Sequence, residues 1–252
     1  MDIMKWNNQI KNNFNKAAND YSNYSVIQKY FAKEIIAVLK NFDLKRGNWY
    51  DLGSGPGFLA DQIETEFPQR NCKRVDFCEN MLTMNRKKTQ RILWDLNKGL
   101  PPTNEETSLI VSNFCIHWLY NPEKIIKNWF SNLITGGILI VTYPTDNSFP
   151  EWKETCKRNN IEYSGMNFPR PEILQNSFLS EEIIKTSNYS YTENFPDIFK
   201  LFRNIINVGA HATLSQRKTV RELKIMQKRW PKDIHNNVNL TWEINILVVK
   251  KL

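Results

Sequence analysis

Glycines and acids in the first half of the chain are spaced in a pattern that predicts a nucleotide-like ligand. The stretch Trp49-Tyr-Asp-Leu-Gly-Ser-Gly-Pro-Gly57 holds three glycines, with Ser54 after the first of them and Asp51 two residues before it. An apolar run, a glycine turn and a helix-like segment, in this order, are typical of the first unit of a nucleotide-binding sheet. The glycines, which let a ligand approach the backbone, are Gly53, Gly55 and Gly57.

A second acid narrows the ligand class. Asp76 ends the next apolar run, Cys72 to Phe77, and follows Gly57 by 19 residues, close to the spacing of an acid that binds ribose hydroxyls. A dinucleotide pyrophosphate prefers the uncharged N-terminus of a helix, whereas an acid at the head of the loop, Asp51, suits a cationic ligand. The residues therefore favour S-adenosylmethionine, which carries a sulfonium and an α-amino group, over NAD. The alternative is an ordinary tight turn between strand and helix.

The elements that would position these residues alternate between apolar strands and helices up to residue 144, which predicts an α/β fold with a parallel sheet covered on both faces. Ligands bind beyond the carboxyl ends of such strands. We therefore expect one rim to be formed by the residues that follow the strand centres, which are Asp51 to Gly55, Asp76, Asp95, Asn113 and Pro144.

The remaining segments are expected to be mostly helical. Residues 5–40 show helical periodicity, and their first part has a face of small and aromatic side chains that includes Phe14 and Tyr21. That face indicates either a partly buried helix or a flap over a ligand. Further elements are a helix at 79–88, a short helix at 178–186, a strand at 188–195, helices at 196–208 and 214–230, and a closing strand at 240–249.

Length and composition limit the class of protein. With 252 residues the chain is long enough for one domain, which we divide into an N-terminal helical flap (1–44), a cofactor-binding core (45–144), a substrate lid (145–210) and a C-terminal helix and strand (211–252). The four cysteines show no C-x-x-C spacing and the N-terminus has no apolar signal-like run. We therefore expect a cytoplasmic monomer with no metal site and no membrane span.

The net charge of +8 favours an acidic partner, which could be a nucleic acid, an acidic protein or an anionic surface. Much of this charge falls in the predicted helix at 215–230, which carries Arg217, Lys218, Arg221, Lys224, Lys228 and Arg229. This helix is either a docking site for an acidic protein or a solvated face, and the pattern leaves both open.

Several motifs carry a resemblance to known families. Asp51-Leu-Gly-Ser-Gly-Pro-Gly57 resembles motif I of the class I S-adenosylmethionine-dependent methyltransferases, and Asp76, Asp95-Leu96 and Thr135-Gly-Gly137 resemble later landmarks of that fold. Five further segments, in order, resemble the malonyl-acyl-carrier-protein O-methyltransferase (BioC) family of biotin synthesis. They are Phe14-x-x-Ala17-Ala18-x-x-Tyr21, Ser112-Asn113-x-x-x-His117-Trp118, Ser148-Phe-Pro-Glu151, Ser177-Phe-Leu179 and Phe202-Arg203 through Ala210. Together they span roughly residues 10–250. His117 stands where the family often has Gln, and Asn204-Ile-Ile-Asn207 replaces a more usual Ser-Leu-Lys-Gly.

The resemblance implies a Rossmann-like α/β fold with a mostly parallel seven-stranded sheet, helices on both faces, an N-terminal flap and a small inserted helical lid. It also implies methyl transfer from S-adenosylmethionine, leaving S-adenosylhomocysteine, to the free carboxylate of malonyl-acyl carrier protein, an acidic partner, or of malonyl-CoA. The methyl ester would prime pimeloyl synthesis for biotin. A carboxylate is already ionised at pH 7, so we expect neither an essential general base nor a metal.

The resemblance also assigns expected roles to single residues. The cofactor would be bound by Asp51, Gly53, Ser54, Gly55, Gly57, Asp76, Phe77, Asp95, Leu96 and Asn113. On the acceptor side, Arg203 would hold the carboxylate bidentately, Tyr21 would orient it and Phe178 would form a wall of the pocket. His117 would be either a catalytic base or a structural residue at a strand end. Two other functions stay open, which are an RNA methyltransferase and a non-catalytic S-adenosylmethionine-binding protein, although nucleic acid is the less favoured partner because no RNA-binding motif is present.

Overall fold

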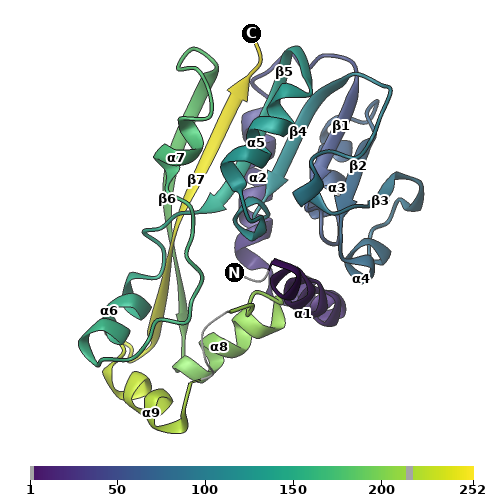
Figure 1. The fold of residues 1–252 in the computed structure, drawn as a ribbon. Helices are drawn as coiled ribbons and strands as arrows, with labels where there is room; N and C mark the ends of the chain where they lie inside the picture. The colour runs from purple at the N-terminus through teal and green to yellow at the C-terminus, as the bar shows by residue number, and fades with distance from the viewer. Residues whose placement is uncertain (1–2, 214–217) are drawn as a thin grey trace.

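A single seven-stranded sheet forms the centre of the protein. The computed structural model describes residues 3–213 and 218–252, and within them the strand order is β3-β2-β1-β4-β5-β7-β6. Strands β1 to β5 pair in parallel with one another, whereas β7 is antiparallel to both β5 and β6. Helices cover the sheet on both sides (Figure 1), so the predicted mostly parallel α/β sheet is confirmed.

The strands, in chain order, are β1 (Asn48–Leu52), β2 (Cys72–Asp76), β3 (Arg91–Leu93), β4 (Thr107–Asn113), β5 (Leu133–Pro144), β6 (Ile183–Phe195) and β7 (Val238–Lys250). The α-helices are α1 (Ile3–Tyr24), α2 (Val26–Leu39), α3 (Phe58–Glu66), α4 (Glu79–Thr83), α5 (Pro122–Ser131), α6 (Pro150–Arg158), α7 (Pro171–Gln175), α8 (Ile198–Asn207) and α9 (Val220–Arg229). One-turn 3₁₀ helices lie at Lys88–Gln90, Leu96–Lys98 and Ile116–Trp118. No described helix combines the length and the apolar character that a membrane span requires.

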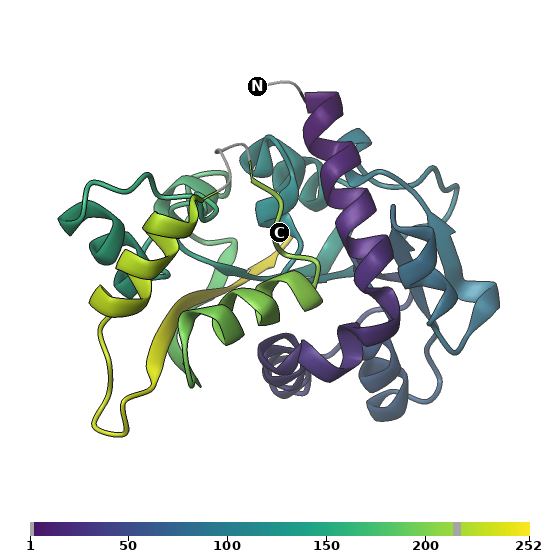
Figure 2. The same ribbon diagram turned by 90° about the horizontal axis from the view of Figure 1, so that it is seen from below.

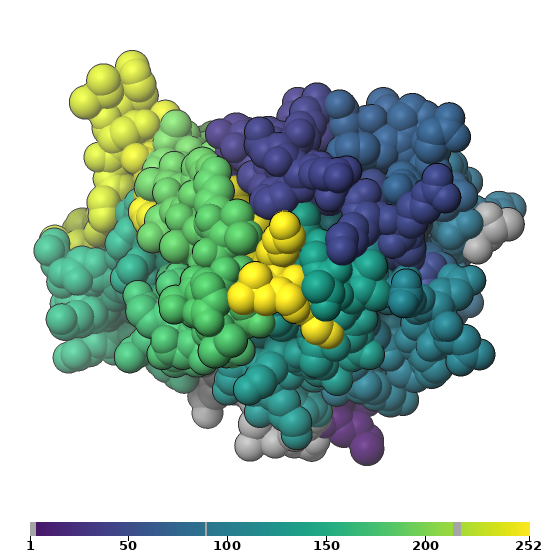
Figure 3. Space-filling model, turned by 90° about the horizontal axis from the view of Figure 1, so that it is seen from above, coloured from purple at the N-terminus to yellow at the C-terminus, as the bar shows by residue number. Residues whose placement is uncertain are grey.

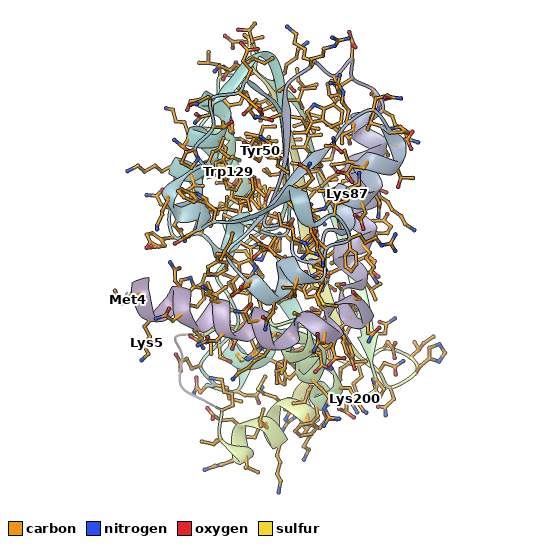
Figure 4. All side chains as sticks on the ribbon, turned by 90° about the vertical axis from the view of Figure 1, so that its right-hand side faces the viewer. Met4, Lys5, Tyr50, Lys87, Trp129 and Lys200 are labelled. Carbon is orange, nitrogen blue, oxygen red and sulfur yellow. The ribbon has the colours of Figure 1, made fainter. Side chains whose placement is uncertain are left out.

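Two helical layers bury the two faces of the sheet. Successive residues of a strand point to opposite faces, so Trp49 packs in the layer of α2 and α3 while Tyr50 packs in the layer of α5 and α7. Figure 4 labels Tyr50 and Trp129 within the second layer. Because both faces are covered, the centres of β4 and β5 are continuous apolar runs.

The carboxyl ends of the parallel strands are covered by α1 and α8, which lie beside each other across this edge (Figure 2). The end of the chain (yellow) lies at the opposite edge, between the teal and green segments, as the order β5-β7-β6 requires (Figure 3). Caps fix where the helices of this edge begin. Asp197 accepts a hydrogen bond from the Lys200 amide at the start of α8, and Thr219 with Glu222 forms a capping box at the start of α9.

Several predicted elements differ in extent. The helix expected at 5–40 is two helices, α1 and α2, that meet at the buried Ser25. The helix expected at 79–88 ends at Thr83, since the following Asn85 donates its side-chain amide to the Gly55 carbonyl across the loop. The helix expected at 214–230 is α9, and its expected beginning, including Arg217, lies outside the described residues.

The prediction of a helix at 178–186 is wrong. Residues up to Glu182 form turns, and β6 begins at Ile183. From there the backbone forms its hydrogen bonds with β7 and not within the helix that the local pattern predicted. The segment 145–210, expected as a lid, therefore also contributes this edge strand to the main sheet. Two helices that were not predicted, α6 and α7, both begin with proline at the first position, a signal that the sequence does contain.

Candidate active site

A cavity of about 280 Å³ lies at the carboxyl ends of the parallel strands. Its wall combines the glycine loop after β1, the ends of β2 and β4, and residues of α1, α6 and α8. Seven of the residues predicted to bind the cofactor line it, namely Gly53, Gly55, Asp76, Phe77, Asp95, Leu96 and Asn113. Of the rim expected from the strand ends, Gly53, Gly55, Asp76, Asp95 and Asn113 line this one cavity, whereas Asp51, Ser54 and Pro144 do not.

The glycine loop is shaped by packing on one side and by open space on the other. All three glycines have positive φ angles, between +52° and +89°, which only glycine adopts readily. A Cβ at Gly53 would collide with the side chain of Cys115, and one at Gly57 with that of Asn85. A Cβ at Gly55 would meet nothing within 4 Å. The backbone at Gly55 can therefore be approached closely by a ligand.

Two acids face the cavity beside this loop. Asp76 accepts hydrogen bonds from the amides of Gly55 and Cys78, both at 2.8 Å. Burial raises the pKa of its carboxyl group, and these two hydrogen bonds oppose the shift. Asp95 accepts from the amide and the side chain of Asn97, both at 3.0 Å, which fixes the turn that carries Leu96. Carboxylates held in this way suit ribose hydroxyls and an adenine amino group, so the residues fit S-adenosylmethionine.

Three predicted cofactor residues lie behind the loop and do not line the cavity. Asp51 is 1% exposed and accepts a hydrogen bond from the Ala60 amide at 3.2 Å, so it anchors α3 rather than facing the ligand. Burial raises the pKa of its carboxyl group to about 7, although the nearby Arg74 opposes the shift. Ser54 is buried beside it, and Gly57 is the N-cap of α3. The structure thus places these three residues outside the cavity wall, and their contacts with the cofactor stay predictions.

Asn113 joins three elements at the cavity wall. Its side-chain NH₂ donates to the Gln28 carbonyl of α2 at 2.8 Å, and its side-chain oxygen accepts from the Thr142 hydroxyl of β5 at 2.5 Å. Gln28 itself lines the cavity. Asn113 therefore ties the start of α2 to the sheet edge in addition to facing the cavity.

Tyr21 places a neutral phenol in the cavity. Its ring stacks on that of Phe58, with centroids 6.3 Å apart, so α1 is held against the start of α3. Burial and the nearby Asp76 both raise the pKa of the phenol. The same two causes raise the pKa of the Cys115 thiol, which lines the same wall.

His117 is a neutral imidazole within an aromatic part of the cavity. It sits on the 3₁₀ turn after β4 and is 8% exposed. Its ring lies 5.1 Å from that of Trp118 and 5.4 Å from that of Phe168. Burial lowers its pKa to about 3. Among the described residues no group forms a hydrogen bond with its Nδ1 atom, so this buried polar atom has no protein partner where a ligand can lie.

Of the residues predicted for the acceptor side, Tyr21 and His117 line the cavity, but most of its remaining wall was not predicted from the sequence. Its walls are mostly aromatic, with Phe149, Trp152, Phe168, Phe202 and Trp242 contributed by four distant segments. Lys218 also lines it and is, in the described part of the chain, the only lysine or arginine that does so. Its side chain is 11% exposed, and its Nζ atom lies 4.0 Å from Glu162. Sequence reasoning placed Lys218 only in a basic helix, because no local pattern shows that it turns inward.

Two predicted acceptor residues lie elsewhere. Phe178 packs against Phe130 of α5, with ring centroids 5.0 Å apart, in the helical layer away from the cavity. Arg203 is exposed on α8 and does not line the cavity. Helical geometry explains this, because Phe202, Ile205 and Ile206 share the inward face and Arg203 is turned away from it. The structure therefore does not bring Phe178 or Arg203 to this cavity, and their roles toward the acceptor stay predictions.

Comparison with known proteins identifies a family and several relatives of this chain. A family model described as a methyltransferase domain matches residues 25–184. A malonyl-acyl-carrier-protein O-methyltransferase of Bacillus cereus is 24% identical over 214 residues, which cover 80% of each chain. A second protein of this name, from Coxiella burnetii, is 23% identical and covers 97% of this chain and 96% of its own. The solved structure of a SAM-dependent methyltransferase from Thermotoga maritima has a TM-score of 0.53 at 15% identity, covering 96% of this chain and all of that one.

Proposed function

The chain belongs to the methyltransferase-domain family, and from this premise we propose that it transfers a methyl group from S-adenosylmethionine to the free carboxylate of a malonyl thioester on an acyl carrier protein. The names of the relatives from Bacillus cereus and Coxiella burnetii support this acceptor. The resulting methyl ester would prime pimeloyl synthesis for biotin.

The observation that carries the proposal is that Tyr21, Cys115 and His117 lie in a cavity wall of mostly apolar and aromatic side chains, which shifts their pKa values. Tyr21 and Cys115 have raised pKa values, and burial lowers the pKa of His117 to about 3. A catalytic base works best with a pKa near the operating pH, so none of these three groups suits the removal of a proton from an alcohol or an amine. A carboxylate needs no such base because it is already ionised at pH 7. The site therefore favours a carboxylate acceptor.

The protein's own residues would bind, orient and exclude water. Bound S-adenosylmethionine would supply the methyl group on a positively charged sulfur. Gly53 and Gly55 would leave room for it, Asp76 would accept hydrogen bonds from its ribose, and Asp95 with Leu96 would hold its adenine. The aromatic walls would keep water away from the acceptor carboxylate, which strengthens its attraction to a cation in the same enclosed space.

A methyl-transfer assay with labelled S-adenosylmethionine tests the proposal. The acceptors are malonyl-acyl carrier protein, malonyl-pantetheine, acetyl-acyl carrier protein and bulk RNA. Base-labile label on the two malonyl acceptors, and none on the acetyl carrier, is the expected result, because only malonyl has a free carboxylate. Stable label on RNA without any on the malonyl acceptors would refute carboxyl methylation and leave the methyltransferase fold.

A further inference from the structure

Helix α9 has one side toward the cavity and one side toward solvent. Lys218, just before the helix, and Leu223 line the cavity, and Met226 is fully buried. On the outer side Arg221, Lys224 and Lys228 are all exposed. Their spacing of three and four places them on one face of the helix. Figure 2 shows α9 at the edge of the molecule, near the N-terminal end of β7.

The outer face is basic around a small apolar floor. A shallow surface hollow is lined by Val220, Arg221, Lys224, Ile225 and Lys228, and Val220 is 70% exposed. Within the described part of the chain, Arg221, Lys224 and Lys228 have no acidic partner within 4.0 Å. The helix has four basic residues and one acid, Glu222, which is engaged in the capping box. The hollow thus presents unneutralised positive charge beside exposed apolar surface.

An aromatic path joins the cofactor side of the cavity to this helix. From Trp118 the ring contacts pass through His117, Phe168 and Phe149 to Trp152, with centroids 5.1 to 6.0 Å apart, and all five residues line the cavity. Trp152 in turn lies 6.4 Å from Trp230 at the end of α9. The acceptor side of the cavity therefore extends to the C-terminal end of α9, the helix whose outer face is basic.

We infer that the outer face of α9, defined by Arg221, Lys224 and Lys228 around Val220, is the docking surface for an acidic acyl-carrier domain, which presents its acyl group to the cavity on a slender arm. This inference rests on the proposed function. Charge complementarity accounts for the basic residues, and the exposed Val220 suits an apolar contact at the centre of a protein interface. An RNA strand is the less suitable occupant, because none of the described residues that line the hollow is aromatic and could stack on a base.

Charge reversal separates docking from chemistry. Lys224→Glu/Lys228→Glu is compared with Lys124→Glu/Lys127→Glu on α5, a pair that is also exposed and makes the same change in charge far from α9. With malonyl-acyl carrier protein, kcat/KM of the α9 variant is expected to fall roughly tenfold, because charges at an interface rim steer association. The loss should shrink as salt is added. With malonyl-pantetheine, which has no protein to dock, both variants should match the wild type.

Three outcomes would overturn the inference. The kcat/KM of the α9 variant with malonyl-acyl carrier protein could be unchanged, the α5 control could lose as much kcat/KM as the α9 variant, or the α9 variant could lose as much kcat/KM with malonyl-pantetheine. If the proposed function itself is wrong, the result is different, because the wild type then methylates neither malonyl acceptor. In that case the anisotropy of a fluorescent holo-acyl carrier protein at low salt still tests docking. Binding by the wild type and the α5 control but not by the α9 variant supports the surface, and equal binding by all three rejects it.

Discussion

At the scale of single residues, Gly55 and Gly57 both have positive φ angles but different surroundings. Alanine in a left-handed conformation costs about 1–2 kcal/mol. At Gly55 the new methyl group points into open space, whereas at Gly57 it collides with Asn85. Gly55→Ala should therefore weaken S-adenosylmethionine binding roughly tenfold or more, about 1.4 kcal/mol, with a small drop in Tm, while Gly57→Ala should mainly destabilise the fold. Calorimetric titration and thermal unfolding of both variants measure the two effects. A larger Tm loss for Gly55→Ala would contradict this reading of the loop.

His117 links the stability of the fold to pH. Its pKa is lowered to about 3 in the folded protein and is about 6.5 in an unfolded chain, so only the unfolded state takes up this proton between those values. The contribution of His117 to the free energy of unfolding is therefore at its maximum above about pH 6.5 and decreases as the pH falls. At pH 5 the loss amounts to about 2 kcal/mol. His117→Gln should remove that part of the decline.

The measurement is the unfolding free energy of wild type and His117→Gln from pH 7.5 to 5. Asp51 has the opposite effect in this range, because its raised pKa makes the folded state bind the extra proton, so the difference between the two proteins is compared rather than either curve alone. His235→Gln, at an exposed histidine, controls for loss of an imidazole. Parallel curves for wild type and His117→Gln would show that His117 is not kept neutral by burial.

At the scale of elements, the orientation of α8 decides which of its residues meet the acceptor. Ile206 is 51% exposed and lines the cavity, whereas Phe199 is 49% exposed and does not. Ile206→Asp should raise the KM for malonyl-pantetheine roughly tenfold, because a carboxylate in the wall repels an anionic acceptor. Phe199→Asp, with similar exposure, should not. Arg203→Ala should stay within about twofold of wild type, as exposed substitutions usually do. Steady-state kinetics of the three variants test this, and a large loss in Arg203→Ala would restore the predicted clamp.

The same elements show what the sequence could and could not predict. Gly53, Gly55, Asp76 and Asp95 were placed on one rim because each lies at or shortly after the carboxyl end of a strand, so local pattern and sheet geometry were enough. The side that Arg203 faces depends on what α8 packs against, and Phe178 belongs to the α5 layer because β6 pairs with β7. Such pairings join residues far apart in the chain, and periodicity within one segment contains no information about them.

Lys218 and His117 extend this argument. The sequence identifies both residues, but the inward position of Lys218 and the neutral state of His117 arise from neighbours on other segments, Glu162 for the lysine and Phe168 for the histidine. The position of Lys218 and the lowered pKa of His117 are therefore properties of the assembled cavity. Composition and spacing alone left Lys218 on a solvated or docking face.

At the scale of the whole molecule, the cavity lies between two parts of the chain that should respond to different ligands. The cofactor side is formed by the glycine loop and covered by α1, and the acceptor side by α6, α8 and the start of α9. S-adenosylhomocysteine at 100 times its Kd should stabilise the folded state by about 2.7 kcal/mol. Hydrogen exchange should then slow locally in Gly53–Gly57 and α1 beyond this global effect, because these segments enclose the ligand.

The internal control is the exposed side of α5. This helix packs on the face of the sheet opposite α2 and α3 and should show only the global change. Helix α9 should likewise gain no local protection from S-adenosylhomocysteine, and it should become protected when holo-acyl carrier protein is added. We expect this difference between the two ligands because the cofactor side and the acceptor side of the cavity are separated along its aromatic path. If S-adenosylhomocysteine alone protected α9 as strongly as α1, the two sides would close as one unit, and docking of the carrier would be coupled to cofactor binding rather than independent of it.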